Sequence, residues 1–267
     1  MFPKERRRQI TEFLKRDGAV KVDVLAQHFG VSVDSIRKDL RSLAKDGICR
    51  REYGGATYIE PETKMEPLPS DQYALAAKAD LDESTLTQDD RGRLSVARRA
   101  YLEINDGDSV FLDISRTNLF LADCIATGDK RVIVTTNMIE IMPRLSCNPK
   151  VTALATGGYL NMQLNGFIGT ATISLLEPLL FAKAFIGTHG VDLNSQGVFV
   201  LEPDDGLVKK QVIQNASYKF LLADSQKFSQ KGNFRFASLT DFSAIISDTE
   251  DMQVIEKVAK MGIPLLR

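Results

Sequence analysis

Residues 31–45 have the sequence VSVDSIRKDLRSLAK, and this stretch decides the fold of the N-terminal part of the chain. Apolar residues recur every three or four positions, at Val33, Ile36, Leu40 and Leu43, which predicts an amphipathic helix. Ser32 can cap this helix, because its hydroxyl can accept a hydrogen bond from a free amide of the first turn. The other side of the helix carries polar and charged residues suited to phosphates and base edges of DNA, namely Asp34, Ser35, Lys38, Arg41, Ser42 and Lys45, with Arg37 at its margin.

A second short amphipathic segment, DVLAQHF at residues 23–29, precedes Gly30, a residue that suits a tight turn. This layout predicts a helix-turn-helix, whose second helix reads DNA. The alternative is a solvated helix in an ordinary helical bundle. Charge favours DNA binding, because residues 1–58 contain 13 Lys and Arg against 8 Asp and Glu, whereas residues 59–267 contain 21 against 27.

A chain of 267 residues, 43% of them hydrophobic, can form more than one domain. We expect a small DNA-binding domain at residues 1–58, an acidic linker at residues 59–92 and a larger domain at residues 93–267. The linker has three prolines and few bulky apolar residues, although residues 73–79 could be helical.

From Leu94 onward, short β-branched runs alternate with longer amphipathic segments. The pattern predicts an α/β domain with a mostly parallel sheet that helices cover on both faces. The expected strands are SVFLDI, RVIVTT, VTALAT, KAFIG, FLLAD, AIIS and IPLL, and the expected helices are NLFLADCIA, MIEIMPRL and residues 171–180, 204–218 and 252–260.

Polar side chains, glycines and cations follow several of these strands, where ligands bind in open parallel sheets. Hydroxyls and amides at the start of a helix suit an oxyanion, and Arg116, Lys209 and Lys227 could offset the charge of a phosphate. Asp113, Asp192 and Asp224 could accept hydrogen bonds from sugar hydroxyls. The residues expected to bind this anionic ligand are Asp113, Ser115, Arg116, Thr117, Asn118, Thr136, Asn137, Gly157, Gly158, Gly187, Lys209, Asp224 and Lys227.

The N-terminal motif resembles the winged helix-turn-helix of the DeoR family of bacterial transcription regulators. The resemblance rests on Arg-Arg-x-x-Ile near the start, Ser35-Ile36-Arg37-Lys38-Asp39-Leu40, Gly47 and Gly54-Gly55-Ala56. It implies that residues 48–58 form the wing, a β-hairpin that touches the DNA backbone. The residues expected to bind DNA are Arg6, Arg7, Ser32, Val33, Asp34, Ser35, Arg37, Lys38, Arg41, Arg50 and Arg51.

Residues 93–267 resemble the DeoR-type effector domain, which is similar in fold to ribose-phosphate isomerases and CoA transferases and usually senses a phosphorylated sugar. The resemblance is carried by Asp113 with Thr117, Thr136-Asn137, Gly157-Gly158 and Ala223-Asp224-Ser225-x-Lys227-Phe228. One departure concerns the first loop, where Ile114, Ser115 and Arg116 replace the family's usual Ser-Gly-Ser/Thr. Arg116 either rebuilds the pocket or occludes it by pairing with Asp113 or a neighbouring carboxylate.

We therefore expect a transcription regulator, most often a repressor in this family, that binds double-stranded operator DNA as a homodimer or homotetramer and responds to a phosphorylated sugar. The alternatives are a sugar-phosphate isomerase-like enzyme and a regulator whose sensor domain has lost its ligand. We expect neither a cofactor nor a metal, because Cys49, Cys124 and Cys147 show no paired spacing. No apolar run approaches the roughly 18 residues of a membrane span, so we expect a cytoplasmic protein without membrane contact.

Overall fold

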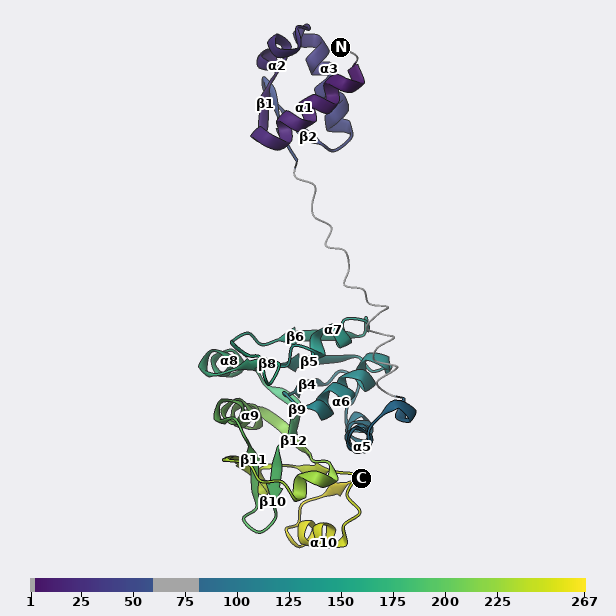
Figure 1. Cartoon of the computed structure of the whole chain (residues 1–267), viewed down its shortest axis with the longest axis vertical. Helices are drawn as coiled ribbons and strands as arrows, with labels where there is room; N and C mark the ends of the chain where they lie inside the picture. The colour runs from purple at the N-terminus through teal and green to yellow at the C-terminus, as the bar shows by residue number, and fades with distance from the viewer. Residues whose placement is uncertain (1–2, 60–81) are drawn as a thin grey trace. The chain divides into compact units, whose positions relative to one another are not determined.

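The computed structural model describes residues 3–59 and 82–267 of the chain, which divides into two compact units, residues 1–66 and 67–267 (Figure 1). The helix considered at residues 73–79 lies outside the described residues. Within residues 3–59, the N-terminal unit contains three helices and a three-stranded antiparallel sheet of order β1-β3-β2. Its elements are α1 (Pro3–Asp17), β1 (Ala19–Lys21), α2 (Val22–Phe29), α3 (Val33–Lys45), β2 (Cys49–Glu52) and β3 (Gly55–Tyr58).

Helix α3 begins and packs as its sequence predicts. Ser32 caps it by accepting a hydrogen bond from the Ser35 amide at 3.3 Å, and Gly30 closes α2 in the left-handed conformation at φ 62°. Ile36, Leu40 and Leu43 are buried against α1 and α2, where Ile10 and Leu14 complete the core. The predicted winged helix-turn-helix is therefore confirmed, with β2 and β3 as the wing.

The C-terminal unit is built on a seven-stranded parallel sheet of order β15-β14-β12-β9-β4-β5-β6. The predicted parallel α/β domain is confirmed. Its strands are β4 (Ser109–Leu112), β5 (Val132–Thr136), β6 (Val151–Ala155), β9 (Phe181–Gly187), β12 (Ala216–Leu222), β14 (Ala244–Ile246) and β15 (Leu265–Leu266).

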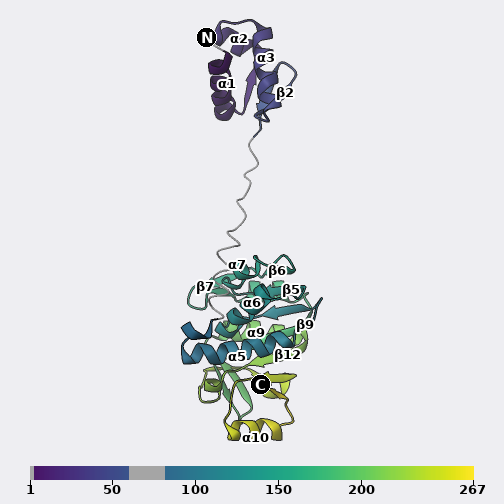
Figure 2. The ribbon, with the colours of Figure 1, turned by 90° about the vertical axis from the view of Figure 1, so that its right-hand side faces the viewer.

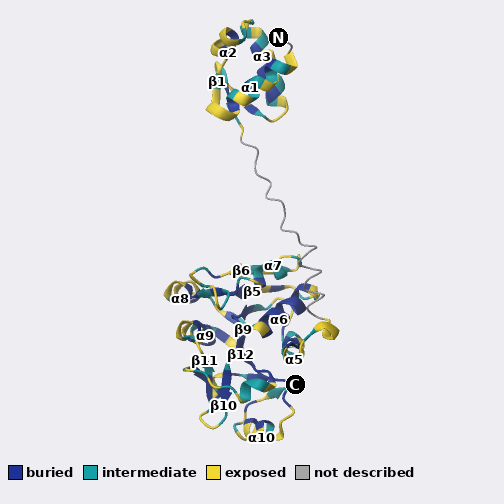
Figure 3. Ribbon diagram, in the orientation of Figure 1, coloured by how far each residue is buried: buried dark blue, intermediate teal, exposed yellow. Residues whose placement is uncertain are grey.

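Helices cover both faces of this sheet, as Figures 1 and 2 show. Along β4 the side chains alternate, so that Val110 and Leu112 pack on one face and Phe111 on the other. One face is covered by α5 (Gln88–Leu102), α6 (Arg116–Thr127) and α7 (Ile141–Leu145). The opposite face is covered by α8 (Thr170–Leu176), α9 (Pro203–Asn215) and α10 (Met252–Lys260). Figure 3 shows the central strands buried between these two layers.

The structure differs from the expectation in several helices. Helix α9 ends at Asn215 instead of residue 218, because Ala216 takes an extended conformation and pairs with Phe181 of β9. Helix α8 ends at Leu176 instead of residue 180. Helix α5 was not expected at all; it begins at Gln88, where the Thr87 hydroxyl accepts a hydrogen bond from the Asp90 amide at 3.2 Å. The last residues of the segment expected as a linker therefore belong to the folded C-terminal unit.

Two small antiparallel elements were not predicted from the sequence. One is a sheet of β10 (Gly190–Asp192), β11 (Gly197–Val200) and β13 (Phe234–Ser238), and the other is a hairpin of β7 (Tyr159–Asn161) and β8 (Gly166–Ile168). Short 3₁₀ turns, η1 (Glu83–Thr85), η2 (Ser225–Phe228) and η3 (Leu239–Asp241), complete the described elements. The small sheet packs against the face that α9 and α10 cover.

Candidate functional sites

The first candidate site is the solvent-facing side of α3. Asp34, Arg37, Lys38 and Arg41 are exposed there, whereas Val33 is partly buried against the core. Arg37 lies 3.4 Å from the Asp34 carboxylate, but both side chains are largely exposed, so the pair restrains Arg37 only weakly. The helix thus presents cations beside its capped N-terminus, where residues of a recognition helix contact base edges.

The wing adds a second set of exposed residues to this unit. Arg50 and Arg51 lie on β2 and are exposed, and Tyr53, at the turn, is fully exposed. Gly54 adopts a positive φ of 81° in this two-residue turn, a conformation that glycine accepts readily. Tyr53 was not among the residues expected to bind DNA, although it lies exposed at the tip of this hairpin.

Arg6 has a different role from the one expected. Its Nε donates a hydrogen bond to the Asp39 carboxylate at 2.6 Å, and both side chains are buried. Arg6 therefore ties α1 to α3 inside the unit instead of contacting the DNA backbone. Arg7 is half-buried and donates to the hydroxyl of Ser42 at 2.6 Å, which places it on the same helix pair.

The second candidate site is a cavity of about 240 Å³ at the carboxyl ends of β4, β9 and β12, which we call the effector cavity. The chain runs from β4 outward through β5 and β6 on one side of the sheet and through β9, β12, β14 and β15 on the other. Ligands bind where the strand order reverses in this way, because the two neighbouring loops diverge and leave a crevice. The effector cavity lies at that point.

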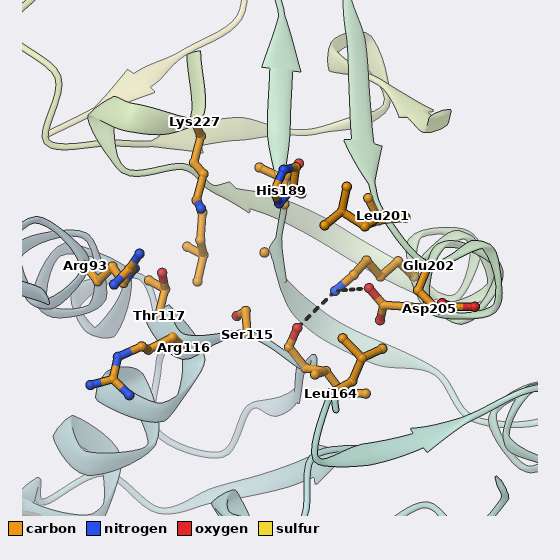
Figure 4. Close-up of a pocket in the computed structure, with 16 residues that line it drawn as sticks. Arg93, Ser115, Arg116, Thr117, Leu164, His189, Leu201, Glu202, Asp205 and Lys227 are labelled. Atoms are coloured by element: carbon orange, nitrogen blue, oxygen red, sulfur yellow. Dashed lines mark hydrogen bonds and ion pairs between the residues drawn. The ribbon is translucent and has the colours of Figure 1, made fainter. Parts of the chain in front are cut away.

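The effector cavity has opposite charges on its two sides (Figure 4). Arg93 of α5, Arg116 at the start of α6 and Lys227 of η2 lie on one side, and Glu202 and Asp205 at the start of α9 lie on the other. Its remaining lining includes Ser115, Thr117, Gly187, Thr188 and His189. An anionic group is therefore favoured near the three cations, and hydroxyl groups can donate to the two carboxylates.

Lys209 lines the effector cavity, and Asp113 lies buried beneath it. The Lys209 ammonium donates to the Asp113 carboxylate and lies 3.4 Å from that of Asp205. Burial lowers the pKa of Lys209, but the two carboxylates together raise it, so the ammonium stays charged. The Asp113 and Asp205 carboxylates therefore already balance the charge of Lys209 at the effector cavity.

Asp113 is fully engaged within the protein and does not line the effector cavity. Its carboxylate accepts hydrogen bonds from the Gly187 amide at 2.8 Å and from the Asn118 side chain at 2.6 Å, in addition to that from Lys209. Asn118 is completely buried and also donates to the Phe185 carbonyl at 2.8 Å. Both residues were expected to bind the effector, but their hydrogen bonds connect β4, β9 and α6 beneath the effector cavity.

Three ionisable groups around the effector cavity have pKa values shifted by burial. Burial raises the pKa of Asp205 to about 6, although Lys209 beside it acts in the opposite direction. Burial lowers the pKa of Lys227, and both burial and the nearby Lys227 lower that of His189. The cavity is therefore a partly desolvated environment, in which charge pairing is stronger than at an open surface.

Arg116 pairs with a neighbouring carboxylate, Asp90, which is the pairing that the occluded alternative required. Its Nε and Nη2 donate to the two Asp90 oxygens at 2.8 and 3.0 Å, and its guanidinium lies 5.7 Å from the Phe120 ring centroid. The pair does not fill the cavity, which stays open with Arg116 at its edge.

Asp224 does not line the effector cavity, but its carboxylate lies close to two of the cations that do, Arg93 and Lys227. It is buried, caps η2 by accepting from the Gln226 amide at 3.3 Å, and lies 3.7 Å from Arg93 and 4.0 Å from Lys227. Burial raises its pKa. Asp192, another expected acceptor, instead bonds the Ser195 hydroxyl within a turn of the small sheet.

Four expected residues follow β5 and β6 and do not line the effector cavity, namely Thr136, Asn137, Gly157 and Gly158. Thr136 accepts a hydrogen bond from the Met138 amide, and Asn137 donates to the Phe167 carbonyl at 2.9 Å. A Cβ on Gly158 would lie 1.9 Å from the Thr172 hydroxyl, so this glycine permits α8 to approach closely. These residues hold β7, β8 and α8 against the sheet.

Several residues that line the effector cavity were not among the expected effector-binding residues, namely Arg93, Thr188, His189, Glu202 and Asp205. Arg93 is the first residue of the expected larger domain, directly after the expected linker, and no expected strand ends near it. Glu202 precedes Pro203 at the start of α9, a signal of a helix start that could have placed it at the cavity.

The described residues contain no cluster of three or more His, Cys, Asp or Glu side chains arranged to hold a metal ion. Cys49, Cys124 and Cys147 are free thiols. None of the helices in residues 3–59 and 82–267 has the length and apolar character needed to cross a membrane.

Family comparisons match both units. A family model described as the DeoR-like helix-turn-helix domain matches residues 6–62, and one described as the DeoR C terminal sensor domain matches residues 89–249. The second match alone spans more than half of the chain.

Similar proteins cover nearly the whole chain. A regulator from Bacillus subtilis (strain 168), described as an uncharacterized HTH-type transcriptional regulator FruR, is 27% identical over 252 residues, which are 94% of each protein. The glycerol-3-phosphate regulon repressor of Escherichia coli (strain K12) is 26% identical over 91% of this chain and 90% of its own length. Among solved structures, ribose 5-phosphate isomerase A from Methanocaldococcus jannaschii is 18% identical with a TM-score of 0.37, covering 51% of this chain and 53% of its own.

Proposed function

Since this chain belongs to the DeoR family of transcription regulators, we propose that it binds operator DNA through α3 and the wing, and that a phosphorylated sugar in the effector cavity changes its affinity for that DNA. The observation that carries the proposal is the charge division of the effector cavity. Three cations on one side suit a phosphate, and two carboxylates on the other suit sugar hydroxyls. The relative from Escherichia coli is named for a phosphorylated compound.

The DNA part of the proposal rests on the exposed cations of the N-terminal unit. Arg37, Lys38 and Arg41 on α3 reach base edges and phosphates, and Arg50 and Arg51 on the wing contact the backbone. The chain acts as a repressor in the cytoplasm. It binds as a homodimer or homotetramer, because a symmetric oligomer pairs two recognition helices with two half-sites one helical turn apart.

The test is a titration of operator binding with sugar phosphates. We would isolate operator DNA from genomic fragments, measure binding by fluorescence anisotropy and add fructose 1-phosphate, fructose 6-phosphate, glucose 6-phosphate, ribose 5-phosphate or glycerol 3-phosphate. At least one should weaken operator binding by roughly 5- to 150-fold, the usual range for coupled sites. The same sugars without phosphate should have no effect.

A matched pair of variants locates the effect in the cavity. Lys227→Gln removes a cation from the cavity and should weaken the response to the active sugar phosphate. Lys231→Gln removes a nearby exposed lysine that does not line the cavity and should leave the response unchanged. Operator affinity that no phosphorylated compound alters would contradict effector sensing and favour a sensor domain that has lost its ligand.

A sugar-phosphate isomerase is a second candidate, because Asp205 lines the cavity and burial raises its pKa to about 6, a value suited to a general base. Asp113 and Asp192 are less suitable as a base, since the Asp113 carboxylate accepts hydrogen bonds within the protein and Asp192 lies in a turn. Incubation of the purified chain with ribose 5-phosphate distinguishes the two functions. Formation of ketose would favour the enzyme, and its absence together with operator binding would favour the regulator.

A further inference from the structure

The Asp90 carboxylate pairs with two of the cations that line the effector cavity, Arg93 and Arg116. It belongs to the first turn of α5 and is buried. Its carboxylate accepts two hydrogen bonds from Arg116 and a third from Arg93 Nη1 at 2.8 Å. Both arginines line the effector cavity, whereas Asp90 does not. The two arginines that line the effector cavity are thus both held by the Asp90 carboxylate.

The strength of this arrangement follows from its geometry. The Arg116–Asp90 pair is bidentate, which is the strongest form of pairing between a guanidinium and a carboxylate. The hydrogen bonds from Arg116 hold the pKa of Asp90 at about 2, so the carboxylate is ionised throughout the physiological range. Asp90 therefore competes permanently with any other anion for these two arginines.

Together with η1, the first turn of α5 belongs to the first described residues of the C-terminal unit. Arg91 donates to the Glu83 carbonyl at 3.2 Å, and Arg98 pairs with the Glu83 carboxylate, so η1 is fastened to α5. Asp89 accepts a hydrogen bond from Gln226 of η2, the turn that carries Lys227. The rest of α5 is anchored by buried apolar residues, including Leu94 and Ala97, so only its first turn can move without disturbing the core.

We propose that Asp90 is a latch that the phosphate of the effector opens by competing for Arg93 and Arg116, and that its release loosens the first turn of α5 together with η1. This inference rests on the proposed function and names the route from the effector cavity towards the DNA-binding unit. A phosphate brought to the two arginines adds negative charge beside Asp90, and repulsion between the two anions favours withdrawal of the carboxylate into solvent. Because Asp90 is part of the capped turn, its withdrawal strains that turn.

The latch makes two linked predictions for Asp90→Asn, which keeps the shape of the side chain and removes its charge. The variant should bind a phosphorylated ligand more tightly, by roughly tenfold if the latch is closed about nine-tenths of the time. Without ligand, its operator affinity should equal that of the ligand-saturated wild-type protein, because the latch is already open. Addition of ligand should then change operator affinity little.

Arg116→Ala breaks the same pair from the other side and provides a second test. The Arg116 side chain is 58% exposed, so its removal leaves the core intact. This variant should show the same shift in ligand-free operator affinity as Asp90→Asn, but it should bind phosphate more weakly because a cavity cation is lost. The latch thus predicts that Asp90→Asn and Arg116→Ala change ligand affinity in opposite directions but change operator affinity equally. A pair that served only to stabilise the fold would not give this combination.

The matched control is Glu103→Gln at the opposite end of α5. It removes one negative charge and the Arg99–Glu103 pair, whose atoms are 2.7 Å apart, and should behave as the wild-type protein. Ligand affinity is measured by calorimetry on the full chain with the five sugar phosphates named above and with inorganic phosphate.

Three results are informative. Tighter ligand binding by Asp90→Asn, with operator affinity shifted as described and Glu103→Gln unchanged, supports the latch. Equal ligand and operator affinities in Asp90→Asn and the wild-type protein overturn the latch while the proposed function stands. If neither protein binds any of the six phosphate compounds, both the latch and effector sensing are overturned.

Discussion

At the scale of single residues, the buried pair of Arg6 and Asp39 removes one cation from the surface of the N-terminal unit. Arg6 contributes to the basic composition of residues 1–58, yet its charge is neutralised inside the unit. Arg6→Ala leaves Asp39 buried without its partner, and we expect a loss of about 3–5 kcal/mol in the free energy of unfolding of this unit. Hydrogen exchange of α1 and α3 amides measures the loss.

The control for this variant is Arg8→Ala on the same helix. Arg8 pairs with Glu5 and Glu12, but these side chains are mostly exposed to solvent. Water and salt screen such pairs, so the variant should exchange at nearly the wild-type rate. Equal acceleration by Arg6→Ala and Arg8→Ala would show that Arg6 contributes only as a surface charge.

Asp205 makes a residue-scale prediction about pH. Burial raises its pKa in the folded protein to about 6 from an ordinary value of 3.8, so the folded state holds a proton that the unfolded state releases. The contribution of Asp205 to the free energy of unfolding is therefore favourable below pH 4 and is lost as the pH rises to about 6. Asp205→Asn lacks this dependence, so its stability relative to wild type should increase between pH 4 and 6.5 in urea unfolding experiments. A constant difference over that range would show that the carboxyl has an ordinary pKa.

At the scale of elements, the wing depends on close contact between β3 and β1. A Cβ on Gly55 would lie 2.2 Å from the Val20 carbonyl oxygen, a backbone atom that cannot move independently. Gly55→Ala should therefore separate the two strands, increase hydrogen exchange in β1 and β3, and weaken operator binding by displacing Arg50 and Arg51. Thr57→Ala in the same strand is the control and should preserve the pairing. Unchanged operator binding in Gly55→Ala would show that the wing does not contact DNA.

Local sequence patterns were sufficient to predict the positions of several helices and strands. The period of the apolar residues and the Ser32 cap located α3, and alternating β-branched runs located the parallel strands. Those signals are local, because they depend on residues within one or two turns. The boundary between α9 and β12 was misplaced because strand pairing with β9 begins at Ala216, a contact that the local pattern does not contain.

At the scale of the whole molecule, the near-neutral chain combines a basic unit with an acidic remainder. If the basic unit binds DNA, the logarithm of the association constant should fall linearly with the logarithm of salt concentration, by about 0.9 per neutralised phosphate. Arg37→Ala should weaken operator binding and reduce this slope. Lys150→Ala, at an exposed position of the sensor unit, should do neither. Equal effects of the two substitutions would indicate nonspecific attraction.

The sequence by itself determined the two-part organisation, the recognition helix with its cap, and the parallel sheet with polar residues at its strand ends, because helical and strand periodicity and charge are properties of neighbouring residues. Only the tertiary structure decided which strand ends form the effector cavity. The sheet order places β4, β9 and β12 side by side and moves β5 and β6, with Asn137 and Gly158, away from it. It also decided that Arg6 meets Asp39 and that Arg116 meets Asp90, since these pairs join residues 33 and 26 positions apart through packing of whole elements.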